Sequence, residues 1–167
     1  TLNLGNGVNI RGTSTTGETL RGTDYADTLI GGDGNDSIYG FDGHDVIEGG
    51  KGNDYIEGTR DNYLDYGDNT YRFNLGDGQD TLSDIRGTDK IVFGAGITQD
   101  TIQLVEDIAT NSSLIIKIGD AGDQIRINYF FYNTDTSNKI ETLQFADGTT
   151  LNLGNGVNIR GTSTTGE

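Results

Sequence analysis

Cysteine, proline, methionine and tryptophan are all absent from the 167 residues, and histidine occurs once. Without cysteine no disulfide can stabilise the fold, so any cross-link has to be a bound metal ion. The same absences remove the usual nucleophilic triads and argue against a zinc site, so we expect no enzyme. From the missing methionine we expect the sequence to be a fragment of a longer chain.

Basic residues are also scarce, with 11 Lys and Arg against 26 Asp and Glu and a formal net charge of −15. This acidity argues against a nucleic-acid partner, which needs a basic face. No apolar run is long enough for membrane insertion, and no signal peptide opens the sequence. Hydrophobic residues make up 32% of the chain, which is low for a domain held by its core alone. Disorder is the simplest reading of such a composition, and only a regular pattern argues against it.

That pattern is a nine-residue repeat in residues 22–57, with the blocks GTDYADTLI, GGDGNDSIY, GFDGHDVIE and GGKGNDYIE. Each block opens with Gly, has Asp in the sixth position and has an aliphatic residue in the eighth. The sixth-position acids are Asp27, Asp36, Asp45 and Asp54. Glu18 takes this position in the preceding block, and Asn69 takes it in block 64–72. The later blocks 75–83 and 84–92 recover it with Asp80 and Asp89.

A second repeat is much longer. TLNLGNGVNIRGTSTTGE at 1–18 recurs unchanged at 150–167, an offset of 149 residues. Chance cannot give such an identity, although a cloning choice could. Self-similarity at a fixed period is typical of repeat architectures, so we expect near-identical modules in tandem.

The nine-residue period predicts a flattened coil. Six glycine-rich loop residues can direct several carbonyl groups and one carboxylate at a common centre, and a three-residue strand follows with its middle residue facing inward. Two blocks then form one turn, with two short parallel sheets and a loop at each edge. Asp27 should stack on Asp45, and Asp36 should stack on Asp54.

Stacked carboxylates repel each other, so the coil should need a cation. A cage of carboxylate and carbonyl oxygens suits Ca²⁺, whereas Mg²⁺ prefers to keep its waters. One buried aliphatic side chain contributes about 1.5–3 kcal/mol. Ordering nine backbones costs about 1 kcal/mol or more each. Metal binding should therefore supply folding free energy. An EF-hand beginning at Asp33 is excluded, because Ile38 stands where that loop requires Gly.

The C-terminal half shows a different pattern. LIIKI at 114–118 and QIRIN at 124–128 alternate, and IETLQF has apolar Leu143 and Phe145, which predicts antiparallel strands with one buried face. The Asp147–Gly148 pair predicts a hairpin turn. We expect this half to cap the open end of the coil.

Residues 31–39 and 49–57 resemble the calcium-binding nonapeptide of the RTX (repeats-in-toxin) family. The resemblance covers 22–57 well and 64–92 weakly. By position, it implies side-chain calcium ligands at Asp27, Asp36, Asp45 and Asp54. It also implies carbonyl ligands around Gly31, Gly32, Gly34, Gly40, Gly43, Gly49, Gly50 and Gly52. Further candidate ligands are the third-position acids Asp24, Asp33 and Asp42, and the out-of-phase pair Asp80 and Asp89. Thr23 and Tyr25 replace the usual glycines, which implies a weaker first loop.

The stretch that runs from NTYRFNLGDGQDTLSD (69–84) to IETLQFADGTTL (140–151) resembles the haemolysin-type calcium-binding-related domain that follows such repeats in secreted bacterial proteins. The fold implied is all-β, a parallel β-roll capped by an antiparallel region. We expect a module junction or N-terminal cap at 1–18, the roll at 19–92, the antiparallel cap at 93–153 and the next module from 150 to 167.

Family membership implies a calcium-folded structural module of a large secreted or cell-surface bacterial protein, adhesin-like or toxin-like and exported by a type I system. Its expected partners are calcium ions and neighbouring modules, with a glycan or a cell surface as a further candidate. Two alternatives stay open. One is a glycan-binding module similar to the R-modules of alginate epimerases. The other is the secretion domain of an extracellular protease or lipase.

Two further features have simple expectations. His44 stands at the fifth loop position and should be a lone surface histidine. The aromatic run at 129–132 should pack in the core or at a sheet edge, with glycan stacking or a contact between modules as the alternative.

Overall fold

The computed structural model describes residues 6–59, 67–107, 109, 112–131 and 140–154. The strands of the roll are β1 (Asn9–Arg11), β2 (Thr19–Arg21), β3 (Thr28–Asp33), β4 (Ser37–Tyr39), β5 (Val46–Lys51), β6 (Tyr55–Glu57), β7 (Thr70–Phe73), β8 (Gln79–Ser83) and β9 (Asp89–Phe93). The C-terminal strands are β10 (Ile102–Asp107), β11 (Ser113–Ile118), β12 (Asp123–Ile127), β13 (Ile140–Gln144) and β14 (Thr150–Asn152). A single 3-10 turn at Gln99–Thr101 precedes β10.

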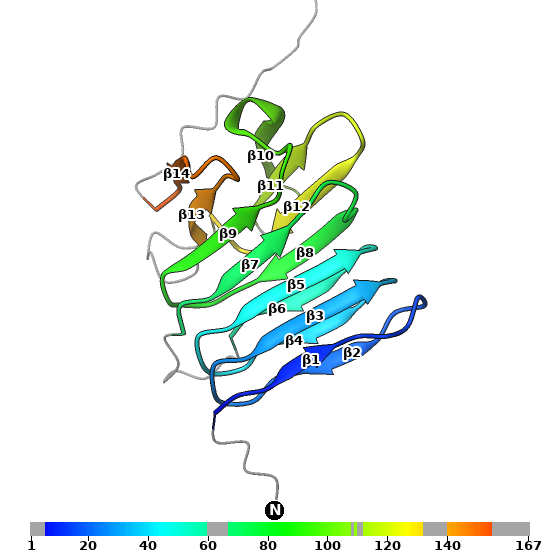
Figure 1. Cartoon of the computed structure of the whole chain (residues 1–167). Helices are drawn as coiled ribbons and strands as arrows, with labels where there is room; N and C mark the ends of the chain where they lie inside the picture. Colours follow the sequence, from blue (N-terminus) through cyan, green and yellow to red (C-terminus); the bar gives the residue numbers. More distant parts are fainter. Residues whose placement is uncertain (1–5, 60–66, 108, 110–111, 132–139, 155–167) are drawn as a thin grey trace, which may run out of the picture.

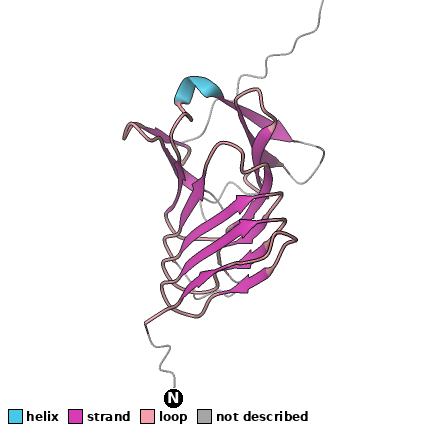
Figure 2. Ribbon diagram, turned by 45° about the vertical axis from the view of Figure 1, so that its right-hand side comes forward, coloured by secondary structure: helices cyan, strands magenta, loops and turns pink. Residues whose placement is uncertain are grey.

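The described strands form two seven-stranded sheets, ordered β1-β3-β5-β7-β9-β13-β14 and β10-β11-β12-β8-β6-β4-β2. From β1 to β9 the chain alternates between the two sheets, and every pairing within this segment is parallel. The coils therefore stack one on another, with β1 and β2 at one end and the C-terminal strands at the other (Figures 1 and 2). This arrangement confirms the predicted parallel β-roll.

The middle residues of the strands form two inward columns. Leu29 pairs with Ile47, Ile47 with Tyr71 and Tyr71 with Ile91, and all four side chains are fully buried. The facing column consists of Leu20, Ile38, Ile56 and Leu82. Because side chains alternate across a strand, one apolar residue per block is enough to line the interior.

Strands β3 and β5 are longer than the predicted three residues. Each continues through the glycine pair of the next block, with Gly32 opposite Gly50 and Asp33 opposite Lys51. The parallel ladder therefore extends into residues that the sequence pattern assigned to loops.

The cap is only partly antiparallel. Strands β10, β11 and β12 form an antiparallel meander, and β13 and β14 form an antiparallel hairpin. However, β12 pairs in parallel with β8, and β13 pairs in parallel with β9. The cap thus extends both sheets of the roll, a continuity that alternation within each strand could not predict.

The cap contributes its own apolar core. The rings of Phe93 and Phe145 stack with their centroids 5.5 Å apart. Phe130 is buried as expected, whereas Tyr129 is exposed and Tyr132 lies outside the described residues. The hairpin turn is confirmed, since Phe145 and Gly148 are linked by a backbone hydrogen bond of 2.9 Å. Within the described ranges, no helix has the length and apolar character needed to span a bilayer.

Candidate metal centre along the two edges of the roll

The sixth-position residues form one column on each edge of the roll. The first-edge column consists of Asp27, Asp45, Asn69 and Asp89, and the second-edge column consists of Glu18, Asp36, Asp54 and Asp80. On both edges the repeating contact is the same: the backbone N–H of one column residue donates to a side-chain oxygen of the next.

On the second edge, Glu18 N–H donates to Oδ1 of Asp36 at 2.6 Å, and Asp36 N–H donates to Oδ1 of Asp54 at 2.8 Å. Asp54 N–H then donates to Oδ1 of Asp80 at 2.9 Å. The predicted stacking of Asp36 on Asp54 is therefore confirmed. Asp80 joins this column although its block is out of phase with the earlier ones.

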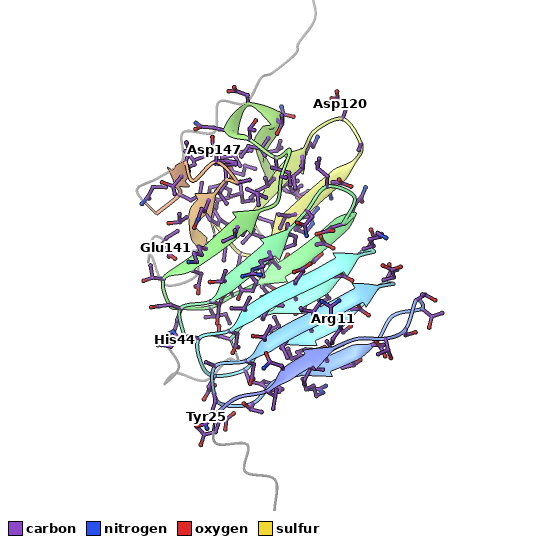
Figure 3. All side chains as sticks on the ribbon, viewed as in Figure 1. Arg11, Tyr25, His44, Asp120, Glu141 and Asp147 are labelled. Carbon is purple, nitrogen blue, oxygen red and sulfur yellow. The ribbon has the colours of Figure 1, made fainter. Side chains whose placement is uncertain are left out.

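On the first edge, Asp27 N–H donates to Oδ1 of Asp45 at 2.8 Å, which confirms the other predicted stack. Asn69 takes the next position and donates its own N–H to Oδ1 of Asp89 at 2.7 Å. The column ends in the cap, where Asp89 N–H donates to Oε2 of Glu141 at 2.6 Å. Tyr25, His44 and Glu141 lie along this edge in Figure 3.

In three of the column acids the second carboxylate oxygen is left for another partner. The Oδ2 atoms of Asp36, Asp54 and Asp89 are buried and have no hydrogen-bond donor among the described residues. Buried polar atoms are normally paired, so these oxygens point to a missing ligand of positive charge.

The opening glycines of the blocks provide the space around these oxygens. A methyl group on Gly31 would collide with Oδ2 of Asp36 and with the carbonyl oxygen of Gly49. Likewise, a methyl group on Gly40 would collide with Oδ2 of Asp45 and with the carbonyl oxygen of Gly58. Carboxylate and carbonyl oxygens of successive turns thus converge on a backbone cradle, which is the donor set that Ca²⁺ prefers.

The remaining predicted glycines shape the loops. Gly32, Gly34, Gly43, Gly50 and Gly52 all have positive φ, between 96° and 138°. Gly52 also packs against the carbonyl of Gly34, so a side chain would be excluded there for two reasons.

Burial raises the pKa of four of the column acids. The pKa of Asp54 rises to about 6, chiefly through burial and with a contribution from the charge of Asp36. The pKa of Asp80 rises to about 8, and that of Asp89 to about 9, again chiefly through burial. Burial also raises the pKa of Asp36. Because a charged carboxylate is unfavourable in these places, a bound cation would stabilise both columns.

No three acidic or imidazole side chains converge into a metal cage by themselves in the part of the chain that the structure describes. Backbone carbonyls therefore have to supply many of the ligands, as the glycine pattern predicts.

The third-position acids lie further out. Asp24 and Asp33 are exposed, and Asp42 is half-buried. Asp33 lies 3.6 Å from the Lys51 ammonium, whose side chain faces solvent as expected. In the first loop the Thr23 hydroxyl lies 3.1 Å from Oδ1 of Asp27. His44 is exposed as predicted, and its Nδ1 accepts the N–H of Asp68 at 2.8 Å.

Sequence reasoning missed four acids at the junction of roll and cap, namely Asp77, Asp84, Asp123 and Glu141. Asp123 Oδ2 accepts the N–H of Gly76 at 2.7 Å, and Asp77 Oδ2 accepts the N–H of Asn74 at 2.6 Å. The available signals were weak, since these residues stand outside the sixth position of any block.

Comparison with known proteins agrees with this geometry. Residues 21–56 match the RTX calcium-binding nonapeptide repeat (4 copies), and residues 114–154 match the haemolysin-type calcium binding protein related domain. No curated protein matches the chain.

One solved structure that resembles the fold is the AlgE6R3 subunit from the Azotobacter vinelandii mannuronan C5-epimerase. It is 23% identical, with a TM-score of 0.50 over 70% of this chain and 73% of that one. The two chains share a β-roll fold. Because the matched repeats are of the calcium-binding type, the ion that they bind is Ca²⁺.

Proposed function

We propose that this chain is a calcium-folded structural module of a larger secreted or cell-surface bacterial protein. The chain belongs to the RTX haemolysin-type calcium-binding repeat proteins. The observation that carries the proposal is the pair of buried acid columns with unpaired Oδ2 atoms at Asp36 and Asp54. Without a bound cation, these buried oxygens would stay unpaired, which is unfavourable.

The proposed role of the column acids is to make folding depend on calcium. In Asp36 and Asp54, Oδ1 accepts a backbone N–H from the neighbouring turn, while Oδ2 is held for the ion beside the opening glycine. Bound calcium would offset the repulsion between Asp54, Asp80 and their neighbours. The free energy of metal binding then becomes free energy of folding.

Calcium dependence supports a secreted location. Cytosolic calcium is low, so the repeats would remain unfolded before export through a type I system and would fold outside. We therefore propose that the module couples secretion to folding. We propose no catalytic role for it.

The long repeat supports a spacer role. Strands β1 and β14 stand at opposite ends of one sheet, and both lie in copies of the same 18-residue sequence. The sequence of β1 recurs at 158–160, six residues beyond the end of β14. We propose that neighbouring modules join through this segment, so that consecutive rolls form an elongated array. An adhesin-like or toxin-like parent protein would use such an array to hold its active parts away from the surface.

A glycan-binding role is a second candidate, favoured by one surface. On the outward face of β2, β4 and β6, the Arg21 guanidinium lies 4.6 Å from the centre of the Tyr39 ring. The Tyr39 and Tyr55 rings lie 6.2 Å apart, and Tyr55 is 36% exposed. Exposed aromatic rings can stack on sugars. The shared fold with an epimerase subunit makes mannuronan a reasonable first ligand to test.

The test of the main proposal is a calcium titration of EDTA-treated protein that is monitored by far-UV circular dichroism. A titration with Mg²⁺ is the control. We expect a cooperative transition from coil to β-structure at about 0.1–1 mM Ca²⁺, the range of extracellular modules, and none with Mg²⁺. A β spectrum in EDTA that calcium leaves unchanged would contradict the proposal. Mannuronan titration of the folded protein and of Tyr55→Ala would then address the second candidate.

A further inference from the structure

Two successive turns of the first edge depart from the repeat at four separate positions. Thr59 follows the opening glycine, Asn69 replaces the column acid, Tyr71 replaces the inward aliphatic residue, and Asp84 stands where an opening glycine is expected. The last assignment follows from the backbone register. Gly22 N–H bonds to Tyr39, Gly40 N–H bonds to Glu57 and Gly58 N–H bonds to Ser83, so the residue stacked on Gly58 is Asp84.

The four residues form one buried cluster. Oδ1 of Asp84 accepts the Thr59 hydroxyl at 2.7 Å, and Oδ2 accepts the Tyr71 hydroxyl and the Asn69 side-chain amide, the latter at 3.4 Å. The N–H of Ile85 adds a fourth donor at 2.7 Å. Asp84 is 5% exposed, and Thr59, Asn69 and Tyr71 are more deeply buried still. We call these four residues the Asp84 cluster.

This arrangement is the reverse of the regular turns. In a regular turn, Oδ2 of a column acid such as Asp36 is buried without a hydrogen-bond donor and is available to a cation. In the Asp84 cluster the chain supplies the anion, and all four of its hydrogen-bond partners are donors. A fully paired buried carboxylate needs no metal ion.

Asn69 shows why an amide replaces the acid. Its Oδ1 accepts Asp45 N–H at 2.9 Å, which preserves the column, while its Nδ2 donates to Asp84. An aspartate at this position could do the first but would repel Asp84. Tyr71 also keeps its proton for donation, because burial and the charge of Asp84 raise its pKa well above the ordinary value.

We propose that the space between these two turns, which the Asp84 cluster fills, binds no calcium ion and that the two turns are held together by the Asp84 carboxylate and its donors instead. The proposal rests on the proposed function, since it assigns calcium to the regular turns and denies it to this space. Successive turns of the roll therefore differ in what holds them together. The turns built from 22–57 require calcium, whereas the contact between the Asn69 turn and the Asp84 turn does not.

The test is the number of calcium ions bound per chain at saturation, counted by native mass spectrometry for three proteins. We expect Asp54→Asn to bind fewer ions than the wild type, and Asp84→Asn to bind the same number. Loss of an ion in Asp84→Asn would overturn the proposal. If Asp54→Asn loses none, the proposed function itself fails, so the two failures are distinguishable.

A second variant covers the case in which Asp84→Asn does not fold. Tyr71→Phe keeps the ring in the core and removes one donor. We expect it to bind as many ions as the wild type and to lower Tm in saturating calcium by about 2–6 °C. A loss of ions would overturn the proposal, and so would an unchanged Tm.

Hydrogen exchange of the wild type, measured while the calcium concentration is lowered stepwise, is an independent test. The backbone N–H of Ile85 should stay protected when those of residues 28–57 have lost protection. Equal loss in both segments would count against a metal-free turn.

Discussion

The backbone N–H of Asp36 donates to Oδ1 of Asp54 across 2.8 Å, from one turn of the roll to the next. The two oxygens of the Asp54 carboxylate therefore have different roles. Oδ1 links the turns, while Oδ2 stays buried beside Gly49 without a donor. A single aspartate per block therefore both sets the stacking register and presents an oxygen to the ion.

Glu18 shows that the length of the column side chain is matched to the length of its loop. Its Oε2 accepts the N–H of Thr13 at 2.6 Å and lies beside Gly12, six residues back along the chain. In the regular block the glycine, Gly31, is five residues before Asp36. The extra methylene of glutamate thus accommodates the extra loop residue.

The Asp36→Asn substitution should weaken calcium binding by at least about tenfold, because the loss of even an outer-shell partner of a metal ligand costs that much. The amide can still accept the hydrogen bond of Glu18, so the stacking contact survives while the charge is lost. The measurement is the calcium midpoint of the folding transition by circular dichroism.

Asp33→Asn is the matched control, because its side chain is exposed and faces Lys51. Its midpoint should stay within about twofold of the wild type, as expected for a surface ion pair. Equal shifts in the two variants would show that overall charge, and not position in the column, controls affinity.

The sequence predicted the regular part of this molecule well, for a physical reason. One glycine, one aspartate and one aliphatic residue recur at fixed positions, and each has a single structural use. That is why the stacking of Asp36 on Asp54 and the inward direction of Ile47 could be predicted from the sequence.

The junction of roll and cap could not be derived in this way. Asp84 is paired with Thr59 and Tyr71, which lie 25 and 13 residues away, and no local pattern signals such contacts. Glu141 likewise meets Asp89 across 52 residues. The parallel pairing of β12 and β13 with the roll depends on these long-range contacts and not on alternation within a strand.

Gly31→Ala should destabilise the calcium-bound fold by about 1–3 kcal/mol, the usual cost of overpacking. The added methyl group would occupy the space between Oδ2 of Asp36 and the carbonyl of Gly49. Denaturant unfolding in saturating calcium measures this loss, and the calcium midpoint should rise with it.

Gly154→Ala serves as the comparison, since the nearest atom to its methyl group is Oδ1 of Asn152 at 3.4 Å. We expect a change within about 0.5 kcal/mol there. If Gly31→Ala leaves the stability unchanged, the space between Oδ2 of Asp36 and the carbonyl of Gly49 is wider than the structure indicates.

Stability without calcium should fall as the pH rises. The folded-state pKa values of Asp54, Asp80 and Asp89 are about 6, 8 and 9, against 3.8 for an ordinary aspartate. The folded protein therefore holds protons that the unfolded chain releases, and each proton lost above about pH 4 costs folding free energy. In EDTA, the amount of folded β-structure should decrease from about pH 5 to about pH 8.

Calcium should reverse this trend, because the ion replaces the protons and binds the charged carboxylates. Its apparent affinity should increase over the same pH interval. Far-UV circular dichroism at several pH values, in EDTA and during calcium titration, measures both trends. A β-structure content in EDTA that increases with pH would show that the column acids are not buried in the metal-free protein.

Ile47→Ala should destabilise the folded protein by about 2–5 kcal/mol, because it opens a cavity in the fully buried column between Leu29 and Tyr71. Val46→Ala is the control, since this neighbouring side chain points out of the roll and is only partly buried. It should cost about 1 kcal/mol or less. Denaturant unfolding in saturating calcium separates the two variants. Comparable losses would mean that bound calcium alone, and not the single apolar residue of each block, determines how strongly the turns hold together.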